Sequence, residues 1–373
     1  MRRTAEAGGR VARLGLLALP FAALLTFAVV VGAIVASAAR AGSLGFDFLA
    51  YYDAARRVLT GGQLYDVTVQ QAGAFGIFYY PPPFLLAVLP FGLLDAGAAT
   101  WLWTGLLLVA FGAGVAIMPV PRTVRWLVIL LAGLSWPFAY AIKLGQVGPL
   151  LFLLFAAGWR WMDRPGPLGL AAAAGAAIKL QPGLVLVWAM GTGRVRAVLV
   201  GVVALAGATV AATALAGGPH IWPDYLALLR NVADPITTPH NFTPGAIAYQ
   251  LGAPDAAAAL VQTTVSVVVA IAVAVAARRA TAEASYLVVV VASQLLSPVL
   301  WDHYAMLLLL PVAWLVARGH WWAVAIPLAT SSALISVSPA ATYPLAFACT
   351  IVALLGVGIR RVPQLAPRVE FAG

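Results

Sequence analysis

Long apolar segments recur along the whole chain, and most charged residues lie in the short polar stretches between them. Runs of about 17–25 apolar residues have the length that an α-helix needs to cross ~30 Å of hydrocarbon. A β-barrel is excluded, because its strands would alternate in polarity over ~10 residues, whereas these runs are continuous. The pattern predicts an all-α polytopic membrane protein. We expect helices over residues 14–39, 84–94, 98–118, 124–142, 147–162, 167–190, 195–216, 257–277, 284–297, 303–317, 320–338 and 341–359, about 12 transmembrane helices.

Two longer polar segments, 40–83 and 217–256, interrupt this pattern, and both fall on the outer face of the membrane in the expected topology. Within the first, residues 48–60 have the spacing of a short amphipathic helix. Such a helix would lie flat in the membrane interface, with Arg56 and Arg57 near lipid head groups; an ordinary connecting loop is the alternative. The residues on its apolar side are Phe48, Tyr51, Tyr52, Ala55 and Leu59.

Composition supports the membrane class, since 63% of the residues are apolar, 9% are charged and the mean hydropathy is +0.96. The net charge of +10 does not indicate nucleic acid, because the arginines gather at the ends of apolar runs rather than along one stripe. This distribution follows the positive-inside rule and places both termini in the cytoplasm. The arginines concerned are Arg2, Arg3, Arg10, Arg13, Arg194, Arg196, Arg278, Arg279, Arg318, Arg360, Arg361 and Arg368.

The centre of the chain fits this rule less well. Strict alternation would place Arg122, Arg125, Arg160 and Arg164 on the outer face. Three prolines interrupt the same region, so broken or re-entrant helices are expected there. These prolines are Pro137, Pro149 and Pro182.

The N-terminal run is interpreted as a retained helix. Ala36-Ser37-Ala38 is similar to a signal-peptide cleavage site, but the run over 14–39 is longer than the usual ~7–15 apolar residues. The lone cysteine, Cys349, lies in the last run, excludes an intrachain disulfide and is expected only to pack.

Asp47 is the first candidate for chemistry, because the chain has only 12 acidic residues and this one follows the first apolar run among aromatic side chains. Ionising a carboxyl group at the bilayer surface costs free energy unless a partner or a function retains it. Capping of the interfacial helix is the alternative. Asp53, six residues further on, would point elsewhere on a helix.

The other polar candidates are the two lysines and an Asp-His pair. Lys143 and Lys179 each lie within an apolar run, where a lysine faces a cavity or a partner or snorkels to the surface. Lys179 is the better candidate, about 11 residues into a predicted helix. Asp302 and His303 open another helix on its outer side, where they could contact a phosphate or an acceptor, or merely cap the helix.

A set of short motifs in residues 40–310 resembles glycosyltransferase family 87, within the GT-C glycosyltransferases. The similarity rests on their order along the chain, and the last is the most distinctive. Thr243 departs mildly from a more usual serine. The motifs are Phe46-Asp47-Phe48-Leu49-Ala50-Tyr51-Tyr52-Asp53-Ala54-Ala55, Leu64-Tyr65, Tyr79-Tyr80-Pro81-Pro82, Lys143-Leu144-Gly145-Gln146, Ala177-Ile178-Lys179-Leu180-Gln181-Pro182, His240-Asn241-Phe242-Thr243 and Leu296-Ser297-Pro298-Val299-Leu300-Trp301-Asp302-His303-Tyr304.

The resemblance implies a single GT-C-like domain over residues 1–373 of a multi-pass protein of the cell membrane, with its active site on the outer face. It implies metal-independent inverting transfer from a polyprenyl-phosphate sugar, most often mannose, to a glycolipid or lipoglycan acceptor. Asp47 would be the general base. The resemblance and the chemistry of a phosphate leaving group together suggest substrate contacts for Lys179, His303, Arg56, Gln146, Asn241 and Tyr80.

The motifs that are missing agree with this reaction. No G-x-G-x-x-G lies in a βαβ pattern, as a nucleotide-sugar donor would favour, and no metal-binding motif is present, so neither a cofactor nor a metal is expected. A multi-pass transporter or lipid flippase is the main alternative and would place its polar site near the bilayer midplane. A catalytically silent scaffold and a membrane acyltransferase are further alternatives.

Overall fold

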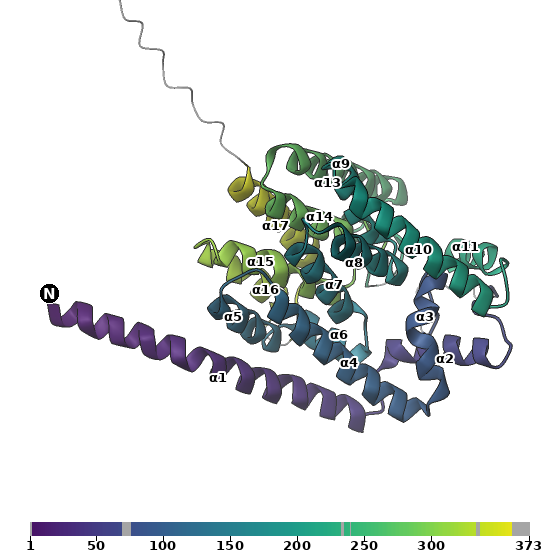
Figure 1. The fold of residues 1–373 in the computed structure, drawn as a ribbon, viewed down its shortest axis with the longest axis horizontal. Coiled ribbons are helices and arrows are strands. Elements are labelled where there is room, and N and C mark those ends of the chain that lie inside the picture. Colours follow the sequence, from purple (N-terminus) through teal and green to yellow (C-terminus); the bar gives the residue numbers. More distant parts are fainter. Residues whose placement is uncertain (1, 69–75, 233–234, 239, 333–335, 360–373) are drawn as a thin grey trace, which may run out of the picture.

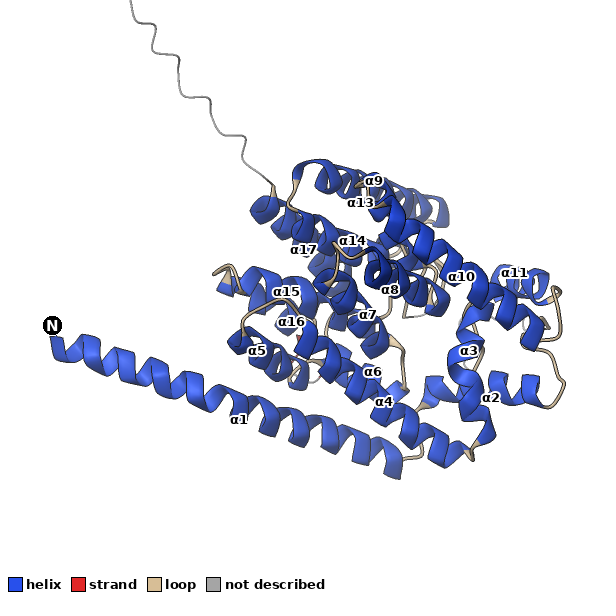
Figure 2. Ribbon diagram, in the orientation of Figure 1, coloured by secondary structure: helices blue, strands red, loops and turns tan. Residues whose placement is uncertain are grey.

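The computed structural model describes residues 2–68, 76–232, 235–238, 240–332 and 336–359. These residues form a bundle of helices, with α1 along one edge (Figures 1 and 2). The helices are α1 (Arg2–Arg40), α2 (Phe46–Leu59), η1 (Pro82–Phe84), α3 (Leu85–Val88), η2 (Leu89–Leu93), α4 (Ala96–Ile117), α5 (Arg122–Gly133), α6 (Trp136–Leu144), α7 (Gly148–Arg160), α8 (Pro165–Ile178), η3 (Gln181–Gly183), α9 (Leu184–Gly191), α10 (Val195–Leu215), α11 (Ile221–Val232), α12 (Pro244–Gln250), α13 (Asp255–Arg279), α14 (Ala282–Leu295), η4 (Asp302–Leu308), α15 (Leu309–Val316), η5 (Trp321–Val324), α16 (Ala325–Ala329) and α17 (Thr342–Gly358). Strands β1 (Ser331–Ser332) and β2 (Ser336–Val337) pair antiparallel.

Four helices in the described part of the chain are long and apolar enough to cross a membrane, and α5 with α6 makes a fifth if this pair, bent by 68°, is one span. The remaining apolar helices have 10–17 residues. The predicted helical membrane class is therefore confirmed, whereas the count of about 12 spans stays a prediction. The four segments are Ala18–Arg40, Ala96–Ile117, Val195–Leu215 and Asp255–Arg279.

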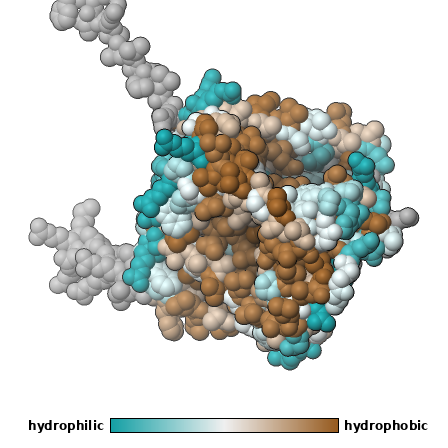
Figure 3. All heavy atoms as spheres, turned by 45° about the vertical axis from the view of Figure 1, so that its right-hand side comes forward, coloured by the Kyte–Doolittle hydropathy of each residue, from teal (hydrophilic) through white to brown (hydrophobic). Residues whose placement is uncertain are grey.

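The surface agrees with a lipid environment. Large apolar side chains are exposed along α4, α10 and α13, among them Val109, Val203 and Leu260. Figure 3 shows apolar residues over most of one face, with hydrophilic residues gathered toward its edges. In water such a surface would favour aggregation, whereas hydrocarbon solvates it without cost.

Helix α2 forms where an amphipathic helix was predicted, and its apolar side is largely the predicted one. Phe48, Tyr51 and Tyr52 are buried, whereas Leu59 is 41% exposed. The buried side packs against protein rather than lipid, on α3, η2, α4 and α6. The ring of Phe48, for example, stacks on Trp103 of α4 at 5.1 Å between centroids. This helix is thus part of the protein core on one side.

The predicted breaks near the prolines are present. Pro137 lies in the first turn of α6, directly after the bend from α5, and Pro149 lies in the first turn of α7. The single helix predicted over 167–190 is wrong, because α8 ends at Ile178 and η3 and α9 follow. A proline ring clashes with the carbonyl group four residues earlier, and for Pro182 that residue is Ile178. Lys179 therefore lies at a helix break in extended conformation rather than inside a helix.

Two further expectations require correction. The helix predicted over 320–338 ends at Ala329. The hydroxyl groups of Thr330 and Ser338 donate to the carbonyls of Pro327 and Ala329 in α16, and such bonds compete with continued helical bonding. The second polar segment, 217–256, was read without helices but contains α11 and α12.

Candidate functional site

Two glycines bring the start of α2 against the end of α6. Gly45 and Gly145 both have positive φ, 74° and 72°, a conformation that glycine adopts without strain. The amide of Gly45 donates to the carbonyl of Lys143 at 2.8 Å. A Cβ atom on Gly145 would lie 2.7 Å from Cβ of Phe48 and 3.3 Å from Cα of Gly45. The close approach of these two segments therefore depends on glycine.

This contact places Asp47, in the first turn of α2, beside Gln146. The side-chain amide of Gln146 donates to Oδ2 of Asp47. The carbonyl oxygen of Gln146 accepts from the hydroxyl of Tyr80 at 3.1 Å. The hydroxyl groups of Tyr80 and Tyr51 bond to each other, and that of Tyr51 also lies 3.4 Å from the Gln146 oxygen. Gln146 is thus fixed by two tyrosines at one end and orients the carboxylate at the other.

The Asp47 carboxylate is partly buried, and burial raises its pKa above the ordinary value of 3.8. The hydrogen bond from Gln146 and the positive charges that His303 and Lys179 can carry oppose this shift, whereas Asp302 adds to it. Asp47 therefore lies within electrostatic range of Lys179 and His303, residues from two distant parts of the chain. A carboxylate with a raised pKa is better suited to accept a proton.

Lys179 reaches this cluster from the break between α8 and η3. Its ammonium group donates to the hydroxyl of Tyr304 and lies over the rings of Tyr304 and Tyr80, 4.1 and 5.5 Å from their centroids. Aromatic faces of this kind stabilise a cation that has left water. Because its helix ends at Ile178, the lysine can point inward rather than along a helix surface.

Asp302 and His303 form the other wall of the cluster. Oδ1 of Asp302 accepts from the backbone amide of His303 at 2.8 Å, and Oδ2 accepts from the indole of Trp136 at 2.9 Å. His303 is 3% exposed, yet neither of its ring nitrogens has a hydrogen-bond partner; Nδ1 lies 3.5 Å from Oδ1 of Asp302. The nearest acceptor to Nδ1 is thus Asp302, whereas Nε2 is buried without a hydrogen-bond partner, which is costly.

Arg56 and Arg57 do not join these residues. Arg56 lies nine residues, about two and a half turns, along α2 from Asp47, and its guanidinium donates to the carbonyl of Gly92 at 3.4 Å. Arg57 donates to the carbonyls of Gln63 and Leu64. Their predicted contacts with phosphate stay predictions.

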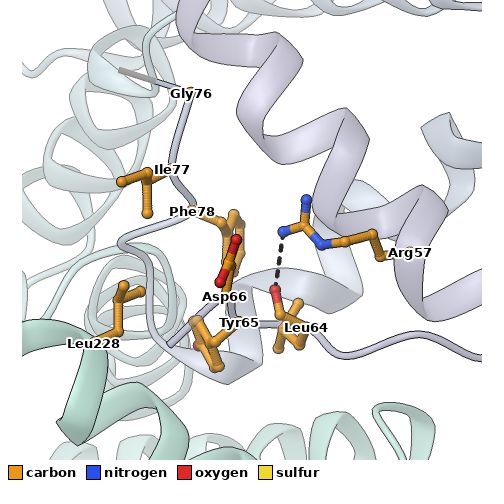
Figure 4. A pocket seen from close by; sticks show the side chains of 8 residues that line it. All are labelled: Arg57, Leu64, Tyr65, Asp66, Gly76, Ile77, Phe78 and Leu228. Atoms are coloured by element: carbon orange, nitrogen blue, oxygen red, sulfur yellow. Dashed lines mark hydrogen bonds between the residues drawn. The ribbon is translucent and has the colours of Figure 1, made fainter. Parts of the chain in front are cut away.

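Arg57 instead lines a small cavity of about 80 Å³ beside Asp66 (Figure 4). Tyr65 and Phe78 form one wall of this cavity, and the hydroxyl of Tyr65 donates to the carbonyl of Tyr80 at 2.7 Å. The cavity is therefore adjacent to the aromatic wall of the Asp47 cluster but does not include Asp47. A larger cavity, of about 520 Å³, lies around Arg194, between the α7–α8 and α9–α10 connections.

Asn241 has a different set of partners from the one expected. Its amide group donates to the carbonyls of Pro235 and Pro298, and its oxygen accepts from the amides of Thr243 and Leu300. The side chain is fully buried and bonded to backbone alone. It joins the segment before α12 to the segment that leads into Asp302, and its predicted contact with substrate is untested.

Four residues of the cluster were not assigned to it from the sequence: Tyr51, Trp136, Tyr304 and Tyr140, whose ring centroid lies 6.4 Å from that of His303. Tyr51 was read as part of an apolar face, and Tyr304 closes the distinctive Asp-His motif, so its position beside His303 was a usable signal. Trp136 and Tyr140 are one helical turn apart, a spacing that occurs in any packed helix and so gave no signal of a site. Among the residues that the structure describes, no group of three or more His, Cys, Asp or Glu side chains could hold a metal ion.

The bundle and its cluster define a class: a helical membrane protein in which a rare carboxylate, a lysine and a histidine meet beside hydroxyl and amide groups. The chain belongs to glycosyltransferase family 87, whose sequence model matches residues 78–298, more than half of its length. It is a glycosyltransferase, as the resemblance of its motifs predicted. The match includes Tyr80, Gln146, Lys179 and Asn241, whereas Asp47 and His303 lie outside it. No curated protein and no solved structure matches the chain.

Proposed function

We propose that this protein transfers mannose from a polyprenyl-phosphate donor to a glycolipid or lipoglycan acceptor at the outer face of the cell membrane. Asp47 is the general base, and the anomeric configuration inverts. Neither a metal nor a cofactor takes part.

One observation supports this proposal above the others. The Asp47 carboxylate is held by Gln146 and lies within electrostatic range of both Lys179 and His303. A base and two groups that can carry positive charge are what this reaction requires at one place.

The chemistry balances with these groups alone. The acceptor hydroxyl oxygen bonds to the anomeric carbon of the sugar while its proton passes to Asp47. The bond from that carbon to the phosphate oxygen breaks, and polyprenyl phosphate leaves with one more negative charge than it had in the donor. Lys179 and the free nitrogens of His303 are suited to stabilise that charge.

The proposed side of the membrane follows from charge and chain order. Asp47 comes shortly after the span Ala18–Arg40, and the arginines near the N-terminus favour a cytoplasmic start for that span. A lipid-linked donor would enter from the bilayer, which surrounds the apolar helices.

Radiolabelled transfer from polyprenyl-phosphomannose in membranes tests the proposal. Asp47→Asn should lower the rate by ~10²–10⁴-fold, the usual contribution of a general base. Asp53→Asn is the matched control, since Asp53 is an exposed acid on the same helix, and it should transfer at the wild-type rate. Normal transfer by Asp47→Asn would exclude Asp47 as the base.

Two further comparisons test the donor and the cation. Lys179→Met should lose activity that Lys179→Arg partly restores, because a positive charge rather than chain length is required. If the wild-type protein transfers sugar from none of the prenyl-phosphate donors, the proposed donor class is wrong and a transport function gains support.

A further inference from the structure

Helix α6 presents one polar-aromatic face toward the cluster. Trp136, Tyr140 and Lys143 are four and three residues apart, which places them on the same side of the helix. All three are partly exposed, whereas Phe138 and Ile142 on the opposite side are buried. The face is therefore available to a ligand although the helix itself is packed.

The two aromatic rings on this face stack on each other as a pair. Trp136 and Tyr140 stack with their centroids 4.9 Å apart and their planes 16° apart. The indole is fixed at its edge by the bond to Oδ2 of Asp302, and its backbone amide donates to the hydroxyl of Ser331 at 2.9 Å. This orientation is held by the protein before any ligand arrives.

The stacked pair lies beside groups that carry the proposed reaction. Tyr140 is within electrostatic range of both Asp47 and Asp302. Its ring centroid is 6.4 Å from that of His303 and 5.9 Å from the ammonium group of Lys143. The unpartnered nitrogens of His303 add buried hydrogen-bonding capacity beside the aromatic pair.

We propose that the Trp136–Tyr140 face of α6 binds a pyranose ring of the substrates by stacking, a role that rests on the proposed function. One face of a pyranose carries C–H groups and is apolar, whereas its hydroxyl groups project from the rim. A ring lying on the outer face of this stacked pair places its rim hydroxyls in the region that Tyr140 shares with His303 and Asp47. The ring belongs either to the acceptor or to the transferred sugar.

A purely structural role accounts for these aromatics less well. A tryptophan that only fills the core is buried, as Trp103 and Trp314 are, and one that only anchors the protein in lipid is exposed, as Trp101 and Trp321 are. Trp136 has intermediate exposure, as Trp126, Trp161, Trp222 and Trp301 also have, but its indole N–H bonds to the buried carboxylate of Asp302, next to His303. Asp302 thus links Trp136 to the neighbouring His303.

Saturation-transfer NMR tests the binding without requiring turnover. The full chain in detergent is titrated with methyl α-mannopyranoside and methyl α-glucopyranoside, with the acyclic polyol mannitol as the probe that lacks an apolar ring face. Wild-type protein should transfer saturation to ring protons of at least one pyranoside and not to mannitol. Trp136→Leu and Tyr140→Leu should each lose at least two thirds of this transfer, and Tyr140→Phe should retain it. The matched control Trp101→Leu, on the apolar surface of α4, should equal wild type.

Kinetics then identify which sugar is bound. Tyr140→Leu should raise one KM about tenfold with kcat within a factor of about two, as expected for the loss of one stacked aromatic contact. A raised acceptor KM assigns the platform to the acceptor, and a raised donor KM assigns it to the donor. Unchanged saturation transfer in both leucine variants, or a fall in kcat with both KM values unchanged, overturns the platform. If the wild-type protein transfers no sugar, the proposed function fails. The NMR experiment still shows whether Trp136 and Tyr140 bind a pyranose, so the two proposals are tested separately.

Discussion

The side-chain amide of Gln146 donates to Oδ2 of Asp47, a residue 99 positions earlier in the chain. The bond joins the end of α6 to the first turn of α2, and Tyr51 and Tyr80 hold the other end of the same amide. One carboxylate oxygen is thereby fixed. Gln146 is a positioning residue for the proposed base.

Replacing Gln146 by leucine should lower kcat/KM by about 10–100-fold, because a hydrogen bond to a charged group contributes ~1.5–3 kcal/mol. The bond from Gln146 holds the pKa of Asp47 down, so its loss should also move the acid limb of the pH–rate profile to higher pH. Gln63→Leu, an exposed glutamine beyond the end of α2, is the control. A slower enzyme with an unshifted acid limb would indicate a merely structural role for Gln146.

The wild-type pH–rate profile should have its acid limb above the ordinary aspartate pKa of 3.8, because burial raises the pKa of Asp47. The base must be ionised to accept a proton, so activity should fall as the pH falls through this raised pKa. Initial rates at saturating acceptor over a series of buffers would measure the limb. A limb at or below 3.8 would contradict the assignment.

Asp47→Asn should unfold at the same temperature as wild type or a higher one at neutral pH. A carboxyl group with a raised folded-state pKa binds protons more readily in the folded state, so the free energy of unfolding decreases as the pH rises through that pKa. The neutral amide removes this cost while Gln146 can still bond to it. Thermal unfolding in detergent at several pH values measures the effect, and the gain should disappear in acid, where wild-type Asp47 is itself protonated.

Asn241→Ala should destabilise the fold by about 3 kcal/mol or more, because it leaves two buried amides and two buried carbonyls without their partners. Asn231→Ala is the comparison, since the exposed Asn231 makes one bond, to the carbonyl of Val67, and should change stability by less than about 0.5 kcal/mol. Denaturant unfolding of both variants in detergent gives the difference. Equal stability of the two variants would assign the role of Asn241 to substrate contact instead.

The fold could be predicted from the sequence where a local rule decides the outcome. The length of the apolar runs gave the helical membrane class, and the spacing of Phe48, Tyr51 and Tyr52 gave α2. The end of α8 at Ile178 also follows from a local rule, the clash of Pro182 with the carbonyl four residues before it. Pro182 was named as an expected break, but the helix was still predicted to run through it to residue 190. The helices of the second polar segment could not be predicted, because their short apolar faces resemble loop sequence until a partner covers them.

The site was predictable in part. Asp47, Lys179 and His303 could be chosen because ionisable side chains are costly in an apolar chain, and the structure places them within one electrostatic environment. Their common neighbours could not be chosen in this way. The position of Trp136 beside Asp302, 166 residues later, depends on the packing of η4 against α6, which no local pattern encodes.

The late position of Asp302, His303 and Tyr304 in the chain separates two events during biosynthesis. All four of the long apolar helices, ending with Asp255–Arg279, leave the ribosome before these residues do. A nascent chain arrested after α13 would thus already hold its long apolar helices. It would still lack Tyr304, the partner of Lys179, and Asp302, the partner of Trp136. If the proposed site is correct, insertion of these helices into the membrane and the onset of sugar transfer are distinct steps, and the second depends on residues after α13.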